Sequence, residues 1–242
     1  MVDIDAAVEM ILAGRHRVPA HESMLVAVSG IDGSGKGYVT ERIVAGIQQK
    51  GLNAVAVNVD GWLNLPPRRF HREQPAEHFY RHAIRFDDMF AQLILPLKRQ
   101  RSIRIEADLA EETATVYHRH VYDFQDTDVI VLEGIYLLKR TYRRYYDLAL
   151  WVDCSFETAL IRALRREQEG LSPDETIQAY QAIYFPAQYI HFALDDPRST
   201  ADTIPTMIAD CGCGEHAFRY WRTETHSVCS EPVMDPSPHR SQ

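Results

Sequence analysis

The stretch VAVSGIDGSGKG, residues 26–37, places four glycines around Lys36. The stretch begins within a compact apolar run at residues 24–28, and residues 38–49 follow it with the apolar spacing of a helix. Glycines let backbone N–H groups converge on phosphate oxygens, the helix N-terminus adds its positive dipole end, and the lysine reaches the terminal phosphates. The order of strand, loop and helix therefore favours a phosphate-binding loop over an ordinary glycine-rich turn.

The loop departs from the usual pattern G-x-x-x-x-G-K-[ST] at its last position. Gly30, Gly35 and Lys36 satisfy the pattern, but Gly37 stands where a hydroxyl residue normally binds magnesium. A magnesium ion would then depend on carboxylates, on water or on a nearby hydroxyl such as Ser34 in the loop or Thr40 in the following helix. The alternative for Thr40 is a surface position on that helix.

Composition limits the class of protein. The 242 residues are 45% hydrophobic and 25% charged, which is typical of a globular chain with a buried core. The net charge of −8 opposes a broad surface for nucleic-acid backbones but allows a local basic cleft for one nucleotide. No apolar run is long enough to cross a bilayer, and the N-terminus lacks the order of a signal peptide. We therefore expect a cytoplasmic protein with a small-molecule partner, and neither a nucleic-acid nor a membrane partner.

Apolar periodicity predicts strands that alternate with helices. The expected helices span residues 3–12, 38–49, 76–97, 156–169 and 173–190, the last bending at Pro186, and the expected strands span residues 24–28, 54–59, 103–105, 129–132 and 148–152. The continuous apolar run at residues 129–132 is typical of a strand that is buried on both faces of a parallel sheet. This alternation predicts an α/β fold in which a doubly wound parallel sheet lies between two layers of helices.

Changes in composition divide the chain into three parts. Residues 1–22 are expected to form a helical extension, residues 23–206 the main domain, and residues 207–242 a loosely ordered tail without periodicity. The four cysteines do not have the spacing of a disulfide scaffold. A metal-binding tail remains an alternative, although its spacing matches no zinc pattern. Its ligands would be Cys211, Cys213, His216, His226 and Cys229.

Two carboxylates at the ends of predicted strands are candidates for the chemistry. Asp60 follows the strand at residues 54–59, and Glu133 follows the apolar run at residues 129–132. Ligands of open α/β sheets bind at the carboxyl ends of the strands, where one carboxylate can act as a base and another can hold magnesium or its water. A turn-forming role for Asp60 and a capping or solvated role for Glu133 are the alternatives.

Over residues 24–205 the chain resembles the uridine kinase and phosphoribulokinase family of P-loop kinases. The segments that carry the resemblance are GIDGSGKG, VDGW, VLEGIYLL and LALWVDCSFETALIRALRRE, supported by YFPAQYIHF and ADTIP. The resemblance implies a P-loop NTPase-like three-layer α/β/α fold with a helical lid, and ATP and Mg²⁺ as cofactors. It also implies transfer of the γ-phosphate of ATP to a hydroxyl, with the 5′-hydroxyl of uridine or cytidine as the leading acceptor.

The resemblance and the motifs together assign roles to individual residues. The expected catalytic residues are Asp60 as the general base, Lys36, and Arg166 as the lid arginine. The expected nucleotide site contains Gly30, Asp32, Gly33, Ser34, Gly35, Lys36, Gly37, Tyr38, Arg162 and Arg166. The expected metal ligands are Glu133, Asp60 and Thr40. The acceptor pocket is expected to contain Asp60, Trp62, Tyr80, His82, His118, Arg119 and His120. A solvated arginine face and surface histidines are the alternatives.

The acceptor and the activity itself have alternatives. Uridine kinases carry a phenylalanine-aspartate-histidine-proline stretch that helps to bind the nucleoside, whereas the comparable region here reads HFYRHAIRF. The DGW segment is similar to the DGF of relatives that phosphorylate pantothenate, so pantothenate, phosphoribulose or another sugar-like acceptor is an alternative. A regulatory nucleotide-binding protein without turnover is favoured by Gly37 and opposed by Asp60, Glu133 and Arg166. A homo-oligomer is left open, since members of the family often assemble.

Overall fold

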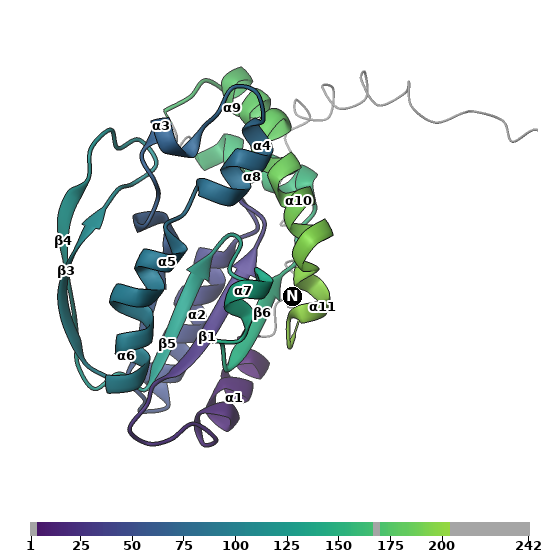
Figure 1. Cartoon of the computed structure of the whole chain (residues 1–242). Coiled ribbons are helices and arrows are strands. Elements are labelled where there is room, and N and C mark those ends of the chain that lie inside the picture. Colours follow the sequence, from purple (N-terminus) through teal and green to yellow (C-terminus); the bar gives the residue numbers. More distant parts are fainter. Residues whose placement is uncertain (1–3, 167–169, 204–242) are drawn as a thin grey trace, which may run out of the picture. The chain divides into compact units, whose positions relative to one another are not determined.

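The computed structural model describes residues 4–166 and 170–203, which contain a parallel sheet between two layers of helices (Figure 1). The chain divides into two units, Met1–Ala209 and Asp210–Gln242, and all described residues belong to the first. The tail expected from residue 207, with its metal-binding alternative, lies outside the described residues. No helix in the described part has both the length and the apolar character that a membrane span requires.

Within residues 4–166 and 170–203, the main sheet has four parallel strands. They are β1 (Met24–Gly30), β2 (Ala54–Asn58), β5 (Val129–Gly134) and β6 (Leu148–Val152), in the spatial order β2-β5-β1-β6. Glu133 of β5 lies opposite Val28 of β1 and Asn58 of β2. The carboxyl ends of these three strands therefore meet at one edge, which is where open α/β sheets bind their ligands.

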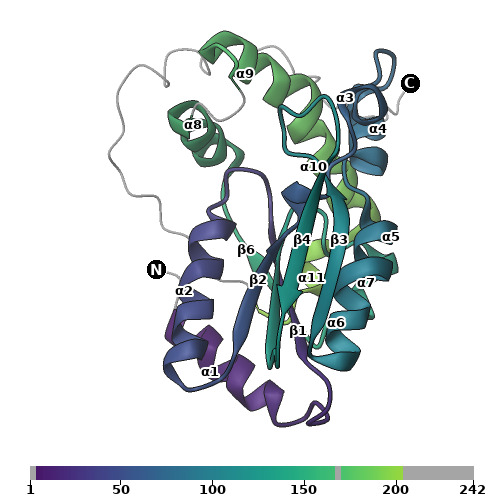
Figure 2. The same ribbon diagram turned by 90° about the vertical axis from the view of Figure 1, so that its left-hand side faces the viewer.

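Side chains alternate across the sheet and form two cores. Leu25 and Ala27 of β1 belong to one core, whereas Val26 and Val28 belong to the other. The second core is closed by α1 (Ile4–Arg15) and α2 (Lys36–Gln49). Figure 2 shows these two helices on one side of the sheet and α5, α6 and α7 on the other. The predicted α/β fold with a doubly wound parallel sheet is confirmed.

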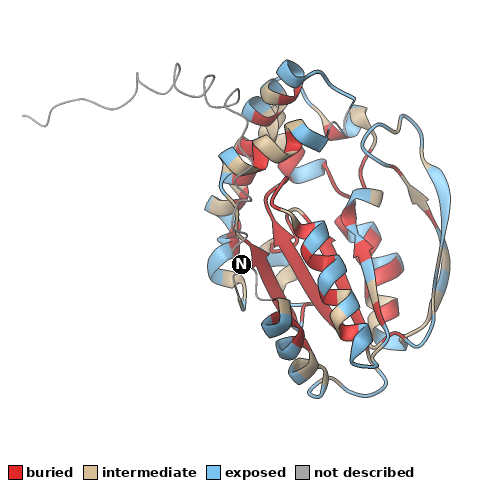
Figure 3. Cartoon of the chain, turned by 180° about the vertical axis from the view of Figure 1, so that it is seen from behind, coloured by how far each residue is buried: buried red, intermediate tan, exposed pale blue. Residues whose placement is uncertain are grey.

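Burial on both faces explains the apolar strand sequences. Every residue of β1, β5 and β6 is buried, and Figure 3 shows the buried positions concentrated on the strands and on the inward sides of the helices. A strand with two covered faces has no solvent-facing side, so its sequence does not alternate between apolar and polar residues.

The single helix predicted over residues 76–97 was wrong. The structure divides it into α4 (Pro75–His82), α5 (Phe86–Met89), the π-helical turn η2 (Phe90–Ile94) and α6 (Leu95–Gln100). The break occurs where Ile84 forms an isolated antiparallel bridge with Leu63, a tertiary pairing that helical periodicity does not reveal. Pro96 does not end the helix, because in the preceding wide turn the Leu95 N–H donates to the Phe90 carbonyl, five residues back. This turn displaces the carbonyl that the proline ring would otherwise meet.

The same wide turn precedes Pro186. The predicted helix at residues 173–190 consists of α9 (Pro173–Ala179), the π-helical turn η3 (Tyr180–Tyr184) and α10 (Phe185–Asp195). A capping box starts α9, because the Ser172 side chain accepts from the Glu175 N–H and the Glu175 side chain accepts from the Ser172 N–H. The helix before it is α8 (Phe156–Arg166), and its predicted extension to residue 169 lies outside the described residues.

The N-terminal helix extends further than expected. Its predicted end was at Gly14, but α1 continues through this residue to Arg15. A Cβ at Gly14 would lie 2.5 Å from the Met24 side chain, so the glycine serves close packing of the helix on β1 and does not end the helix.

The strand expected near residue 103 is half of an antiparallel hairpin. It is formed by β3 (Ile103–Leu109) and β4 (His118–Phe124), and Figure 1 shows it beyond α5 and α6, apart from the parallel sheet. The strand β4 was not predicted, because its side chains are largely exposed and rich in charged and polar groups. Tyr122 of β4 stacks on Trp62 with ring centroids 6.0 Å apart, which ties the hairpin to the segment after Asp60. The remaining short helices are η1 (Val59–Gly61), α3 (Pro66–Arg69), α7 (Arg140–Arg143) and α11 (Pro197–Thr200).

Gly134 provides a test of the packing at the carboxyl end of β5. A Cβ at this residue would lie 2.1 Å from Cγ2 of the buried Val59, so we expect Gly134→Ala to lower the free energy of unfolding. The expected loss is about 1–3 kcal/mol, since overpacking forces neighbouring atoms to move. Gly37→Ala is the matched control, because nothing lies within 4 Å of its Cβ and alanine favours the helix. Urea unfolding followed by circular dichroism measures both, and equal stability of the two variants would contradict the prediction.

Candidate active site

The loop after β1 is held in a conformation that requires glycine. Gly33 and Gly35 have φ angles of 73° and 92°, in the left-handed region. A Cβ would lie 2.7 Å from the Val152 carbonyl oxygen if placed on Gly30, and 2.5 Å from the Ala159 carbonyl oxygen if placed on Gly33. The loop therefore packs closely against β6 and α8 and ends at the N-terminus of α2, which is the geometry that phosphate binding by backbone N–H groups requires.

Buried polar groups surround the loop. The hydroxyls of Ser34 and Thr40 are buried and have no hydrogen-bond partner in the part of the chain that the structure describes. Lys36 is also buried, and its Nζ donates to the Ile31 carbonyl oxygen at 3.2 Å. A buried hydroxyl without a partner costs free energy, which a ligand oxygen or a cation at the loop would recover. The groups present thus fit a nucleoside triphosphate with a divalent cation.

The residues of this site do not form a complete metal cage by themselves. No group of three or more His, Cys, Asp or Glu side chains within residues 4–166 and 170–203 is placed to hold a metal ion. A magnesium ion would therefore take part of its shell from phosphate oxygens and water, as it commonly does.

Asp60 and Glu133 lie next to Lys36. Asp60 is in η1, where the Asn58 side chain accepts from its backbone N–H at 2.7 Å, and Glu133 is buried near the end of β5. Burial raises the pKa of Glu133. Neighbouring protein groups also desolvate the Asp60 carboxyl and raise its pKa, although part of the Asp60 surface stays exposed. The charge of Asp32 raises both pKa values further. The Lys36 ammonium opposes this rise in pKa but does not cancel it. A raised pKa makes the Asp60 carboxylate a stronger base for a nearby hydroxyl.

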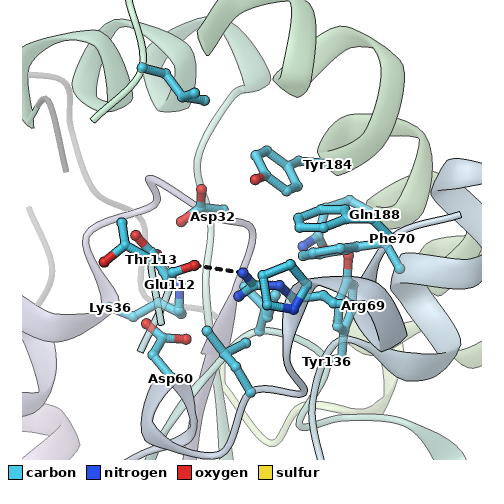
Figure 4. A pocket seen from close by; sticks show the side chains of 15 residues that line it. Asp32, Lys36, Asp60, Arg69, Phe70, Glu112, Thr113, Tyr136, Tyr184 and Gln188 are labelled. Carbon is cyan, nitrogen blue, oxygen red and sulfur yellow. Dashed lines mark hydrogen bonds between the residues drawn. The ribbon is translucent and has the colours of Figure 1, made fainter. Parts of the chain in front are cut away.

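A cavity of about 290 Å³ opens beside these groups. Figure 4 shows Asp32, Lys36 and Asp60 on one side of it and Gln188 and Tyr136 on the other. The remaining lining residues are Leu63, Pro66, Arg69, Phe70, Phe79, Glu112, Thr113, Ile135, Leu171 and Tyr184. The cavity therefore joins a charged end near the loop to a largely aromatic end, and its size suits a small molecule.

Arg69 is the main charged group of the cavity that the sequence analysis did not identify. This residue at the end of α3 is 5% exposed, and its Nη2 donates to the Glu112 carbonyl oxygen at 2.6 Å. Its guanidinium also lies 4.9 Å from the centre of the Phe70 ring. The PPRR segment soon after Asp60 was an available signal, but only the fold shows which arginine points inward. Tyr136, Tyr184 and Gln188 had no signal, because such residues are common in buried segments.

The aromatic acceptor candidates lie in the core and not in the cavity wall. Trp62 is fully buried beneath Tyr122 of the hairpin. The Tyr80 hydroxyl donates to the buried Asp195 carboxylate, and burial together with this hydrogen bond raises the pKa of Tyr80. Both side chains therefore support the wall of the cavity from behind.

The basic acceptor candidates also lie apart from the cavity. His82 lines a second, more open cavity. His118, Arg119 and His120 are exposed on β4, and the Arg119 guanidinium lies 3.1 Å from Glu106 and 2.9 Å from Asp108. Of the residues expected to bind the acceptor, Asp60 is the one that lines the cavity.

The helix α8 places two arginines against the loop. Arg162 Nη1 donates to the Ser34 carbonyl oxygen at 2.9 Å, and Arg166 Nη2 lies 3.6 Å from Asp32 Oδ1. The Tyr180 hydroxyl of η3 also donates to Asp32. Asp32 thus connects both α8 and η3 to the loop, as expected of a helical lid. The remaining nucleotide-site candidate, Tyr38, is exposed at the start of α2.

Comparison with known proteins agrees with this arrangement. The family model described as "Phosphoribulokinase / Uridine kinase family" matches residues 25–204. A uridine kinase of Staphylococcus aureus (strain JH9) is 25% identical over 213 residues, covering 86% of this chain and 97% of the relative. A possible uridine kinase from Bacillus stearothermophilus aligns with a TM-score of 0.65 at 18% identity, covering 83% of this chain and 96% of that chain. A suspected fructose transport system kinase from Silicibacter sp. TM1040 aligns with a TM-score of 0.66 at 23% identity, covering 84% and 99% of the two chains.

The open space at Gly37 gives a test of the metal site. Nothing lies within 4 Å of a Cβ at this position, so a serine side chain fits where the loop pattern normally has a hydroxyl. We expect Gly37→Ser to bind MgATP about 2- to 10-fold more tightly than Gly37→Ala, which is the effect of one additional polar contact. Isothermal titration calorimetry measures both affinities, and an equal affinity of the two variants would show that the hydroxyl is not used.

Proposed function

Since this chain belongs to the phosphoribulokinase and uridine kinase family, we propose that it transfers the γ-phosphate of ATP to the 5′-hydroxyl of uridine or cytidine. The observation that carries the proposal is that Lys36 of the loop and Asp60 line one cavity large enough for a small acceptor. A phosphate bound by the loop and a hydroxyl placed in the cavity would then meet beside a carboxylate. We further propose that residues 23–206 form the kinase domain of a cytoplasmic protein whose partners are small molecules.

Each residue of the site has a defined task in this proposal. The loop N–H groups and Lys36 bind the phosphates, and Arg162 and Arg166 of the lid neutralise charge on the phosphoryl group during transfer. Asp60 accepts the proton of the acceptor hydroxyl as its oxygen attacks the γ-phosphorus. Glu133, Asp60 and Thr40 would hold a magnesium ion together with water, and a bound ion would neutralise phosphate charge. Phosphoryl transfer asks the protein mainly for this positioning and charge neutralisation.

The cavity wall supports a nucleoside over an entirely polar acceptor. Phe70, Phe79, Tyr136 and Tyr184 make the end away from Asp60 largely aromatic. A flat base can stack on such side chains. The guanidinium of Arg69, 4.9 Å from the centre of the Phe70 ring, is the cationic group that a phosphorylated sugar would use at this end. Pantothenate or another sugar-like acceptor remains the alternative. An acceptor with an apolar part would fit the aromatic side chains better than an entirely polar one.

Replacement of Asp60 tests its role as the base. We expect Asp60→Asn to lower kcat with uridine by about 10²- to 10⁴-fold, because the amide cannot accept the proton. MgATP affinity should stay within about threefold, since the loop and the lid bind the nucleotide. The release of ADP measures turnover, and Asp174→Asn on the exposed first turn of α9 is the matched control. Unchanged turnover of Asp60→Asn would remove Asp60 as the base.

The raised pKa of Asp60 predicts the acid limb of the pH profile. Because burial raises the pKa of this carboxyl above the ordinary value of 3.8, protonation inactivates the base at a correspondingly higher pH. The kcat/KM for MgATP, with uridine as the acceptor, should therefore be constant at neutral pH and fall as the pH decreases through the raised pKa. The pH dependence of kcat/KM for MgATP measures this midpoint, because it reports ionisation of the protein before the nucleotide and its metal bind. A midpoint at or below 3.8 would contradict a desolvated base.

A further inference from the structure

Gln188 lines the cavity and contains an unsatisfied polar group. It lies in α10 with 1% of its surface exposed. Its side-chain oxygen is buried and has no hydrogen-bond partner among the described residues. A buried amide oxygen without a donor costs free energy, and a ligand that brings an N–H or O–H group would recover it. The position therefore favours a ligand that donates a hydrogen bond.

Tyr136 presents a second such group. It is 1% exposed, and its hydroxyl is buried without a partner in the part of the chain that the structure describes. Its ring centroid lies 5.4 Å from that of Tyr80 and 5.4 Å from that of His191, so aromatic neighbours hold it on two sides. Its backbone φ is 59°, an uncommon angle for an aromatic residue that the surrounding packing must maintain.

The two groups occupy the end of the cavity away from the phosphate-binding loop. Figure 4 shows Gln188 and Tyr136 on the side opposite Lys36 and Asp60. Phe70 and Phe79 line the same aromatic end. An acceptor whose hydroxyl reaches Asp60 would therefore place its other end against aromatic rings, an amide and a phenol.

The chemistry of this end indicates what it binds. Both Gln188 and Tyr136 are uncharged, so they suit a neutral edge better than a carboxylate or a second phosphate. The amide oxygen needs a donor, and the phenol hydroxyl can donate to a neighbouring acceptor. An edge with an N–H next to a carbonyl or ring nitrogen satisfies both, as in the paired contacts by which amide side chains recognise bases. Uracil and cytosine have such edges, whereas simple sugars do not.

We propose that Gln188 is a specificity-determining residue of the acceptor site, which together with Tyr136 binds the paired donor and acceptor edge of a pyrimidine base. This inference rests on the proposed function, because it requires the nucleoside hydroxyl to lie at Asp60 in the same cavity. Gln188 selects the acceptor and takes no part in the transfer of the phosphoryl group. Its replacement should therefore change acceptor binding and leave MgATP binding unaltered.

The test compares ligands that differ at one atom of the edge. The full chain with Mg²⁺ and a non-hydrolysable ATP analogue is titrated calorimetrically with uridine and with 3-methyluridine, in which a methyl group replaces the N3 hydrogen. We expect the native protein to bind uridine at least about 10-fold more tightly, the effect of one buried hydrogen bond. Gln188→Leu should weaken uridine binding by a similar factor and remove the difference between the two ligands. Gln181→Leu, an exposed glutamine in η3, is the matched control and should keep both properties.

Thermal unfolding provides a readout that does not depend on the acceptor. Because Gln188→Leu removes an unsatisfied buried oxygen, the melting temperature of the unliganded variant should stay equal or rise by about 2–4 °C. Gln188→Met, with an unbranched side chain of similar volume, is the second variant in case leucine packs poorly. A marked fall in melting temperature for both variants would mean that the amide serves the fold, and it would overturn the inference.

The outcomes separate this inference from the proposed function. Suppose that the native protein phosphorylates uridine and Gln188→Leu binds uridine as tightly as the native protein does. This result would overturn the role of Gln188 and leave the uridine kinase activity intact. Equal affinity of the native protein for uridine and 3-methyluridine would have the same meaning. Phosphorylation of pantothenate or a sugar, with no binding of uridine or cytidine, would overturn both while the phosphotransfer chemistry stands. Binding of MgATP without binding or phosphorylation of any of these acceptors would also overturn both.

Discussion

Strand β5 pairs in parallel with β1 on one side and with β2 on the other, and this pairing controls the position of every group in the site. The register places Glu133 directly opposite both Val28 and Asn58. The loop that follows β1, the turn that carries Asp60 and the end of β5 therefore meet at one edge of the sheet. A shift of one residue would point Glu133 to the other face, because side chains alternate along a strand.

The charged groups of the site also lie at this edge of the sheet. Burial opposes ionisation of Asp60 and Glu133, whereas the Lys36 ammonium favours it, and for both carboxyls the effect of burial is larger. The two carboxyls and Asp32 also repel one another across this small space. Lys36, Arg69 and Arg166 oppose this repulsion at Asp60, and Arg166 belongs to α8, a helix far along the chain. Arg166 approaches Asp32 and Arg162 approaches the loop carbonyls, so α8 supplies part of that positive charge.

The cavity combines segments that are distant in the sequence. Its lining comes from the loop, from the segment after β2, from the connection between β3 and β4, and from α10. The second of the two proline-containing helices contributes to this arrangement, because it contains the π-helical turn η3 just before Pro186 and continues beyond it as α10. In the second helix this turn carries Tyr180, which donates to Asp32, and precedes Gln188 in the cavity wall. The cavity wall and the lid contact thus depend on one continuous helix.

The sequence alone determined the α/β fold, the glycine loop and the carboxylates that follow the strands, because each depends on local backbone geometry or on apolar periodicity. Its motifs also carried the resemblance that indicated the family. Gly33 and Gly35 adopt left-handed angles that glycine permits without steric cost, and a strand buried on both faces is apolar along most of its length. Only the tertiary structure decided the break at Ile84, the separate hairpin, and the choice of Arg69, Tyr136 and Gln188 over Trp62 and the histidines of β4 as cavity residues. These features depend on contacts between residues far apart in the chain, and the identity of a side chain does not state whether it faces solvent, the core or a cavity.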